Sequence, residues 1–214
     1  MSFFLQILLL ILTVLTQCKS APYHNPMLWE DTADIDVFGV NDTFYYSASS
    51  MHFSPGAPIL RSLDLVSWEF AGHSVPALDF GSDYYDLIGG QACVKGVWAS
   101  FLKYRESNAL FYWGGCINFT NTYIYTSAAV ERPWEQAAVL GTCYYDCGLL
   151  IDDNDIMYVS YDGGTISVAQ LSQDGLSQVL TQEVFSSSSD IGYIEGSRFY
   201  KAQRQLLHLS HSSR

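Results

Sequence analysis

Positive charge is scarce in this sequence. Its 214 residues include 10 Lys and Arg against 22 Asp and Glu, which gives a formal net charge of −12. A protein that binds nucleic acid presents a basic surface to the phosphates, so this balance argues against a nucleic-acid partner. An acidic surface is compatible with a neutral ligand such as a sugar.

Charged residues are few altogether, at 15% of the chain, and aromatic residues are equally frequent. Disordered segments have few aromatics and many charges, so disorder is excluded. No stretch repeats its apolar residues with the helical period of 3.6. The sequence also lacks an H-E-x-x-H or facial-triad histidine pattern and a G-x-S-x-G nucleophile elbow. We therefore expect a folded domain with little helix, no metal and no cofactor.

Long apolar runs are absent except at the N-terminus, where Phe3 to Thr16 form 14 nearly uninterrupted apolar residues. A membrane-spanning helix needs about 20 such residues, so the run predicts a secretory signal peptide. Small residues allow cleavage after Ser20, and a bacterial lipoprotein signal with its lipid on Cys18 is the alternative. We expect a signal peptide at 1–20, a mature domain at 21–214, secretion, and no membrane contact after cleavage.

Signal cleavage would leave four cysteines, which allow three disulfide pairings. The sequence does not choose among pairings of the following residues: Cys93, Cys116, Cys143 and Cys147. Glycosylation sequons at Asn41 and Asn118 fit surface turns of a secreted glycoprotein.

Short runs of β-branched and aromatic residues, separated by turn residues, predict an all-β fold. Tyr45, Tyr112 and Tyr158 each follow a turn, and Leu207 holds the matching place in a fourth unit. The offsets between these four positions are 67, 46 and 49 residues. Units of this size, each with room for four short strands, are typical of a β-propeller, and a two-sheet sandwich is the alternative.

A second position recurs in the same units. Trp68 and Trp134 follow the repeated aromatic by 23 and 22 residues, and we match Val184, 26 residues after its aromatic, to them. The fourth unit has only seven residues after its repeated position. We therefore expect an incomplete propeller of about three and a half blades, lacking its C-terminal part.

Counting back 11 to 14 residues from the repeated position reaches an acid in three units and a tryptophan in the other: Asp34, Trp98, Asp146 and Glu195. The innermost strand of a blade faces the central channel, so these side chains are expected to converge. Acids that face one another in a half-buried funnel repel, which favours protonation of at least one. Glycoside hydrolysis needs one carboxylic acid and one carboxylate in this arrangement.

The segments around these acids resemble glycoside hydrolase family 43. Matching segments occur in order at the following places: Asn25–Leu28, Ala33–Val40, Phe44–Tyr46, Ser54–Ile59, Arg61–Trp68, Val97–Ser100, Tyr145–Asp153 and Ile194–Lys201. The resemblance implies a five-bladed propeller that hydrolyses β-xylosides and α-L-arabinofuranosides with inversion. It implies that Asp34 is the general base, Asp146 tunes and orients the acid, and Glu195 is the general acid. One departure is Ala33, which stands where the family usually has proline.

The remaining site candidates are Trp98 and Phe53, as an apolar wall for a sugar ring, and Arg198, as a substrate-binding residue near the acid. Asp36 is expected to be structural, and the acidic run 152–155 to form a hairpin turn. The sequence thus predicts a secreted hydrolase of xylose- or arabinose-containing plant polysaccharides or oligosaccharides. The alternative is an inactive propeller remnant that binds carbohydrate. The sequence does not indicate the oligomeric state.

Overall fold

The computed structural model describes residues 23–51, 53–81, 96–188, 190, 192–202 and 205–213. The predicted signal peptide at 1–20 and Cys93 lie outside these residues. Within them, no helix has the length and apolar character needed to cross a membrane.

The described residues form antiparallel sheets in which strands that follow one another in the chain are also neighbours in space. Blade 1 contains β1 (Asp36–Val40), β2 (Thr43–Ser47), β3 (Gly56–Ser62) and β4 (Glu69–Val75). Blade 2 contains β5 (Ser100–Arg105), β6 (Leu110–Ile117), β7 (Asn121–Ser127) and β8 (Glu135–Leu140). Blade 3 contains β9 (Gly148–Ile151), β10 (Met157–Tyr161), β11 (Thr165–Leu171) and β12 (Gln178–Ser186). Blade 4 is a pair, β13 (Tyr193–Ala202) and β14 (Gln205–Ser213).

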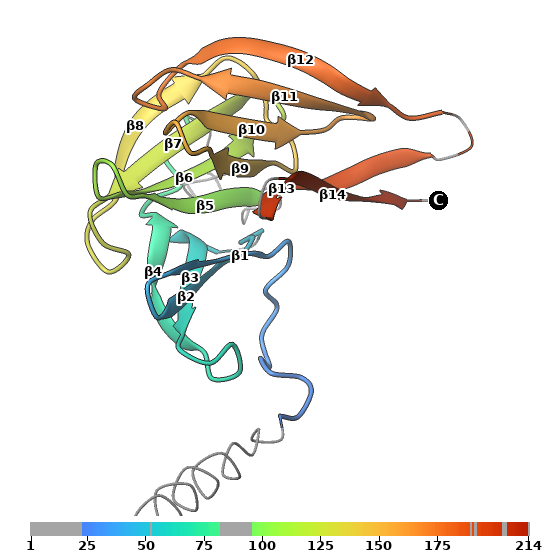
Figure 1. The fold of residues 1–214 in the computed structure, drawn as a ribbon. Coiled ribbons are helices and arrows are strands. Elements are labelled where there is room, and N and C mark those ends of the chain that lie inside the picture. The colour runs from blue at the N-terminus through green and yellow to red at the C-terminus, as the bar shows by residue number, and fades with distance from the viewer. Residues whose placement is uncertain are drawn as a thin grey trace, which may run out of the picture.

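The first strands of the four blades lie around a common centre (Figure 1). β1 contacts β5, β5 contacts β9, and β9 contacts β13, so each blade meets the next through its innermost strand. Three four-stranded sheets and a pair confirm the predicted incomplete propeller of about three and a half blades and exclude the two-sheet sandwich.

The repeat read from the aromatics corresponds to the second strand of each blade. Tyr45 lies in β2, Tyr112 in β6, Tyr158 in β10 and Leu207 in β14. The four positions are therefore structurally equivalent, as the sequence predicted.

The second repeated position is confirmed only in two blades. Trp68 and Trp134 directly precede the outer strands β4 and β8, whereas Val184 lies late in β12 and is 55% exposed. The match of Val184 to the tryptophans is wrong because β12 begins sooner after the repeated aromatic than β4 or β8 does. The nine-residue β12 also shows register shifts against β11.

Alternation along the strands of blade 2 buries both of its faces. Phe101 and Ile124 pack in the apolar cluster shared with blade 3, while their neighbours Leu102 and Tyr125 pack in the cluster shared with blade 1. Successive side chains on a strand point to opposite faces, so a sheet between two others reads as continuously apolar. These two clusters hold the blades side by side.

Polar and covalent links also join the blades. The buried carboxylate of Asp36 on β1 accepts hydrogen bonds from Leu102 N at 3.1 Å and from Lys103 Nζ at 3.1 Å, both on β5. This confirms a structural acid. A disulfide joins Cys116 on β6 to Cys143 ahead of β9, which settles a pairing that the sequence left undetermined.

Candidate active site

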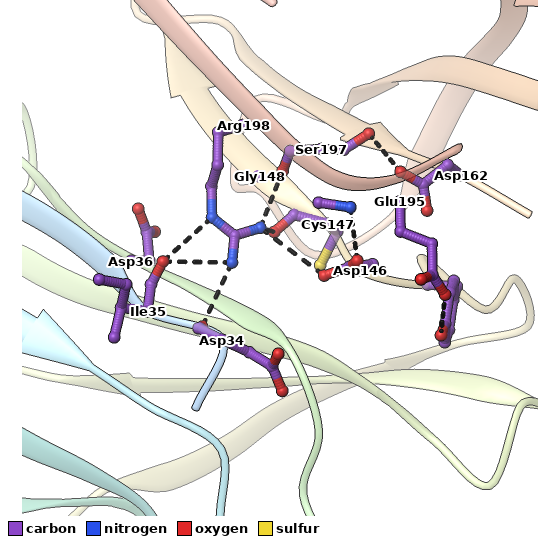
Figure 2. Close-up of polar contacts among 12 residues, drawn as sticks. Asp34, Ile35, Asp36, Asp146, Cys147, Gly148, Asp162, Glu195, Ser197 and Arg198 are labelled. Atoms are coloured by element: carbon purple, nitrogen blue, oxygen red, sulfur yellow. Dashed lines mark hydrogen bonds and ion pairs between the residues drawn. The ribbon is translucent and has the colours of Figure 1, made fainter. Parts of the chain in front are cut away.

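Three of the predicted site residues lie at equivalent places ahead of the inner strands, and Glu195 lies near the start of one. Asp34, Trp98 and Asp146 each stand two residues before the inner strand of their blade, and Glu195 is the third residue of β13. The backbone of Asp34 has φ 57° and that of Asp146 has φ 49°. Left-handed φ values are uncommon outside glycine and often mark functional sites. The structure thus brings the three acids to one end of the axis (Figure 2).

Asp34 is held by the loop that follows β2. Ser49 Oγ donates a hydrogen bond to Asp34 Oδ2 at 2.6 Å, and Ser49 N–H donates to the carbonyl of Ala33 at 3.0 Å. Ser49 is buried, whereas Asp34 is exposed. The carboxylate is therefore fixed in direction while water can still reach it.

Glu195 is held by a tyrosine that the sequence analysis did not select. The hydroxyl of Tyr145 donates to Glu195 Oε1 at 2.8 Å. Burial, followed by the hydrogen bond and charge of Glu195, raises the pKa of Tyr145 above its usual range, so the phenol keeps its proton. Because Oε1 accepts this bond, Oε2 is the oxygen of Glu195 that can carry and donate a proton.

Asp146 feels the negative charges of both other acids. Its Oδ2 accepts a hydrogen bond from Gly196 N at 2.5 Å, and its Oδ1 lies 4.0 Å from Arg198 Nη1. Burial raises the pKa of Asp146, and the negative charges of Asp34 and Glu195 raise it further. The Gly196 N–H and the Arg198 charge oppose this shift. The charges of Asp34 and Glu195 thus both act on Asp146.

Two glycines allow the strands that carry Asp146 and Glu195 to meet. A Cβ on Gly148 would lie 2.7 Å from the Ser197 carbonyl oxygen, so only glycine allows β9 to approach β13 this closely. Gly196 has φ 81°, and the register of β13 against β14 shifts between Glu195 and Arg198. Bulges of this kind redirect side chains near active sites.

Arg198 uses all of its donors within the protein. Its Nε and Nη2 donate to Ile35 O, and Nη2 also donates to Asp34 O, each at 3.3 Å. Its Nη1 donates to Cys147 O at 3.0 Å and to Ser197 O at 2.9 Å. A guanidinium has five N–H groups, so none is left for a substrate. Arg198 joins blades 1, 3 and 4, an arrangement that favours positioning over the predicted substrate contact.

Aromatic side chains line the site beside Asp146. The ring of Trp98 meets that of Phe119 with centroids 5.0 Å apart, and Phe119 meets Tyr145 at 5.6 Å. These three residues and Asp146 border a small cavity. Phe119 is 57% exposed and has φ 56°, which is rare for a bulky residue. The exposed Phe53 lies farther along the loop after β2, and its stacking role stays a prediction.

The sequence profile of the family described as Glycosyl hydrolases family 43 matches residues 23–207. The chain belongs to glycosyl hydrolase family 43.

Curated relatives include a β-xylosidase and an α-L-arabinofuranosidase. The chain is 34% identical, over 120 residues, to a β-xylosidase of Formosa agariphila, an alignment that covers 55% of this chain and 19% of that protein. It is 26% identical, over 185 residues, to the non-reducing end α-L-arabinofuranosidase BoGH43B of Bacteroides ovatus, with 84% of this chain and 34% of that protein covered. The chain therefore spans about a third or less of the length of these relatives.

A solved family 43 structure is more similar. It comes from work on engineering the active site of a glycoside hydrolase to give both endo-xylanase and exo-arabinofuranosidase activity. The TM-score is 0.82 at 46% identity, with 88% of this chain and 38% of that chain covered. A bifunctional family 43 protein of Bacteroides eggerthii has a TM-score of 0.77 at 26% identity, with 90% and 26% covered.

Some residues of this family 43 site had a sequence signal and others had none. Tyr145 directly precedes Asp146 and is the first residue of a segment that matches the family, so the sequence contained a signal for it. Phe119 lies within the Asn118 sequon, which indicated only a surface turn. Ser49 had no signal, because its contact with Asp34 spans 15 residues. In the ranges that the structure describes, no group of three or more His, Cys, Asp or Glu could hold a metal ion.

Proposed function

We propose that this chain carries a glycoside hydrolase site that cleaves xylosidic or arabinofuranosidic bonds with inversion. The observation that carries the proposal is the meeting of Asp34, Asp146 and Glu195, from three blades, at one end of the axis. The β-xylosidase and the arabinofuranosidase among the relatives support the substrate class.

The contacts support distinct roles for the acids. Asp34, exposed and oriented by Ser49, acts as the base that deprotonates the attacking water. Glu195 donates a proton from Oε2 to the leaving oxygen while Tyr145 holds Oε1. Inverting hydrolysis requires these two carboxyls on opposite sides of the sugar, with room for one water. Asp146 and Arg198 orient the two reacting groups.

Trp98, Phe119 and Tyr145 supply the apolar side of the site. Aromatic rings bury the C–H face of a sugar and fix its orientation, while carboxylates contact its hydroxyls. We assign the sugar ring to this side, next to Asp146. No cofactor enters the reaction, since proton transfer between carboxyls and water is sufficient.

The leaving group offers the sharpest test of these roles. Glu195→Gln should lower kcat on unactivated xylo- and arabino-oligosaccharides by about 100-fold or more, because the leaving oxygen receives no proton. It should lower kcat much less on a nitrophenyl glycoside, whose leaving group needs no proton. Asp34→Asn should lower both rates equally. Proton NMR of the first anomer released reports inversion.

Glu135→Gln is the matched control, since Glu135 is exposed at the start of β8. It should match the parent on both substrates. Equal losses for Glu195→Gln on activated and unactivated substrates would remove Glu195 from the acid role.

A second candidate is carbohydrate binding without turnover. It is favoured by blade 4, which is a pair where the other blades have four strands. Calorimetric titration with the same oligosaccharides, beside the hydrolysis assay, separates the two functions. Binding with no released sugar would support the second candidate over the first.

We also propose that the protein is secreted. Disulfides persist in oxidising compartments, so the Cys116–Cys143 bond supports this location. The sequon residues Asn41 and Asn118 are exposed on hairpin turns, which supports glycosylation. Mass spectrometry of protein recovered from the medium of the source cells, before and after glycosidase treatment, tests both points.

A further inference from the structure

A second buried polar cluster lies against the strand that carries Glu195. Asp162, just after β10, is 4% exposed, and its Oδ2 accepts a hydrogen bond from Ser197 Oγ at 2.9 Å. Ser197 Oγ also lies 3.1 Å from His208 Nε2 on β14. A serine hydroxyl has one proton, so when Ser197 donates to Asp162 it accepts from a proton on His208 Nε2.

The cluster ties three elements together at the catalytic segment. Asp162 N–H donates to the carbonyl of Tyr145, the residue whose hydroxyl holds Glu195. Ser197 itself stands between Gly196, which donates to Asp146, and Arg198. Figure 2 shows Asp162 bound to Ser197 beside this segment. Displacement of Asp162 would therefore move both the general acid and its tyrosine partner.

The carboxyl of Asp162 also has an incomplete set of partners. Its Oδ1 is buried and has no hydrogen-bond partner among the described residues. A buried ionised oxygen without a donor is costly, so this environment favours the neutral form of the carboxyl. Burial raises the pKa of Asp162 to about 7, the negative charges of Asp146 and Glu195 raise it as well, and hydrogen bonds from Ser197 oppose the shift.

The titratable and charged groups around Asp162 come from three elements: Tyr145 and Asp146 ahead of β9, Tyr193, Glu195 and Arg198 on β13, and His208 and His211 on β14. Burial lowers the pKa of His208, so it is neutral near pH 7. The charges that act on Asp162 are therefore mainly those of Asp146 and Glu195.

We propose that Asp162 is a positioning residue of the active site: through its hydrogen bonds with Ser197 and Tyr145 it fixes the bulged segment that carries Glu195 and the tyrosine that holds this acid. The proposal rests on the proposed function, because it assigns Asp162 to that same site. Asp162 contacts no substrate and acts through the other acids.

Substitutions at both ends of the Asp162–Ser197 hydrogen bond test this role. Asp162→Ala removes the acceptor for Ser197 and should lower kcat about tenfold with KM little changed. Asp162→Asn keeps the shape and an acceptor, so it should keep kcat within about threefold of the parent. Ser197→Ala removes the donor and should lower kcat about tenfold, as expected for one lost hydrogen bond.

Asp79→Asn is the control, because Asp79 is exposed after β4 and far along the chain from the cluster. It should change neither kcat nor its pH profile. Folded Asp162→Ala and Ser197→Ala proteins that both keep the kcat of the parent would overturn the proposal.

A second measurement tests the environment of Asp162 without requiring enzymatic activity. Carbon-13 NMR of the side-chain carboxyls should show an aspartate that titrates near pH 7 in the parent and is missing from Asp162→Asn. In Asp146→Asn this titration should move to lower pH, because the negative charge of Asp146 helps to raise the pKa of Asp162. An inactive parent that shows both NMR results would refute the proposed hydrolysis and leave the buried cluster beside Glu195 in place. Absence of the near-neutral titration would refute the buried environment on which the proposal depends, whatever the activity.

Discussion

Replacement of Arg198 tests how the site is held across the axis. Arg198→Met removes the charge and all five donors but keeps a long apolar stem. Arg198→Lys keeps the charge but offers three donors from a single nitrogen, which cannot reproduce the planar fork. Both variants leave the three acids in the chain.

The structure gives the size of the effect. Cys147 and Ser197 are both 0% exposed, and their carbonyls accept from Arg198 Nη1. A buried acceptor left without its donor costs about 1–3 kcal/mol. Asp34 and Ile35 are exposed, so water can replace Arg198 at their carbonyls at little cost. We expect Arg198→Met to lower the free energy of unfolding by about 2–4 kcal/mol.

The loss of kcat in the Arg198 variants should exceed what their lower free energy of unfolding alone would cause. Arg198 anchors the backbone on both sides of the site, and a misplacement of about 1 Å can cost about 100-fold in rate. We expect Arg198→Met to lower kcat about 100-fold and to change KM by no more than about threefold. The kcat of Arg198→Lys should lie between those of the parent and Arg198→Met. Steady-state kinetics and urea denaturation measure the two quantities, and added guanidinium should partly restore kcat in the Met variant.

The opposite kinetic pattern would refute this reasoning. A parent-like kcat with KM raised tenfold or more would mean that Arg198 binds substrate in the ground state. That is the role predicted from the sequence, and it would require the guanidinium to release its backbone partners when a sugar enters.

Three further outcomes follow from other contacts. Tyr145→Phe should lower kcat about tenfold by removing the bond to Glu195 Oε1, and an unchanged kcat would show that the bond does not orient the acid. Replacing Cys116 and Cys143 together by alanine should lower the free energy of unfolding by about 3.5 kcal/mol for a separation of 27 residues, and a loss below about 1 kcal/mol in urea denaturation would contradict this. Asp162 keeps its proton more tightly when folded, so the stability it contributes is complete below its ordinary pKa of 3.8 and is lost as pH rises through about 7. The difference is about 4 kcal/mol at full burial and about 2 kcal/mol with partial hydration, and thermal melts of Asp162→Asn should lack this pH dependence.

The sequence predicted the parts of the fold that repeat. Tyr45, Tyr112 and Tyr158 mark second strands because a buried or half-buried position on these strands selects the same side-chain type in three blades. Val184 failed as a repeat marker because outer strands face solvent and are free to change length. Every residue of β12 is exposed, so packing does not fix its register.

In the site, too, the sequence revealed the residues at repeated positions and missed those that act through contacts distant in the chain. Asp34 and Asp146 were found because they hold one place relative to a repeated strand. Ser49 and Asp162 were not found, because each acts through a contact with another loop or blade that leaves no spacing in the chain. The role of Arg198 depended on which atoms its donors reach, and only coordinates give that information.

A preparation of these 214 residues would present β14 as a sheet edge. Among the described strands, none pairs with the outer side of β14, and Leu207 and Leu209 on it are 43% and 57% exposed. Exposed backbone edges with apolar side chains recruit strands from other molecules. Protein concentration is therefore an experimental variable for such a preparation, and its light scattering should rise with concentration.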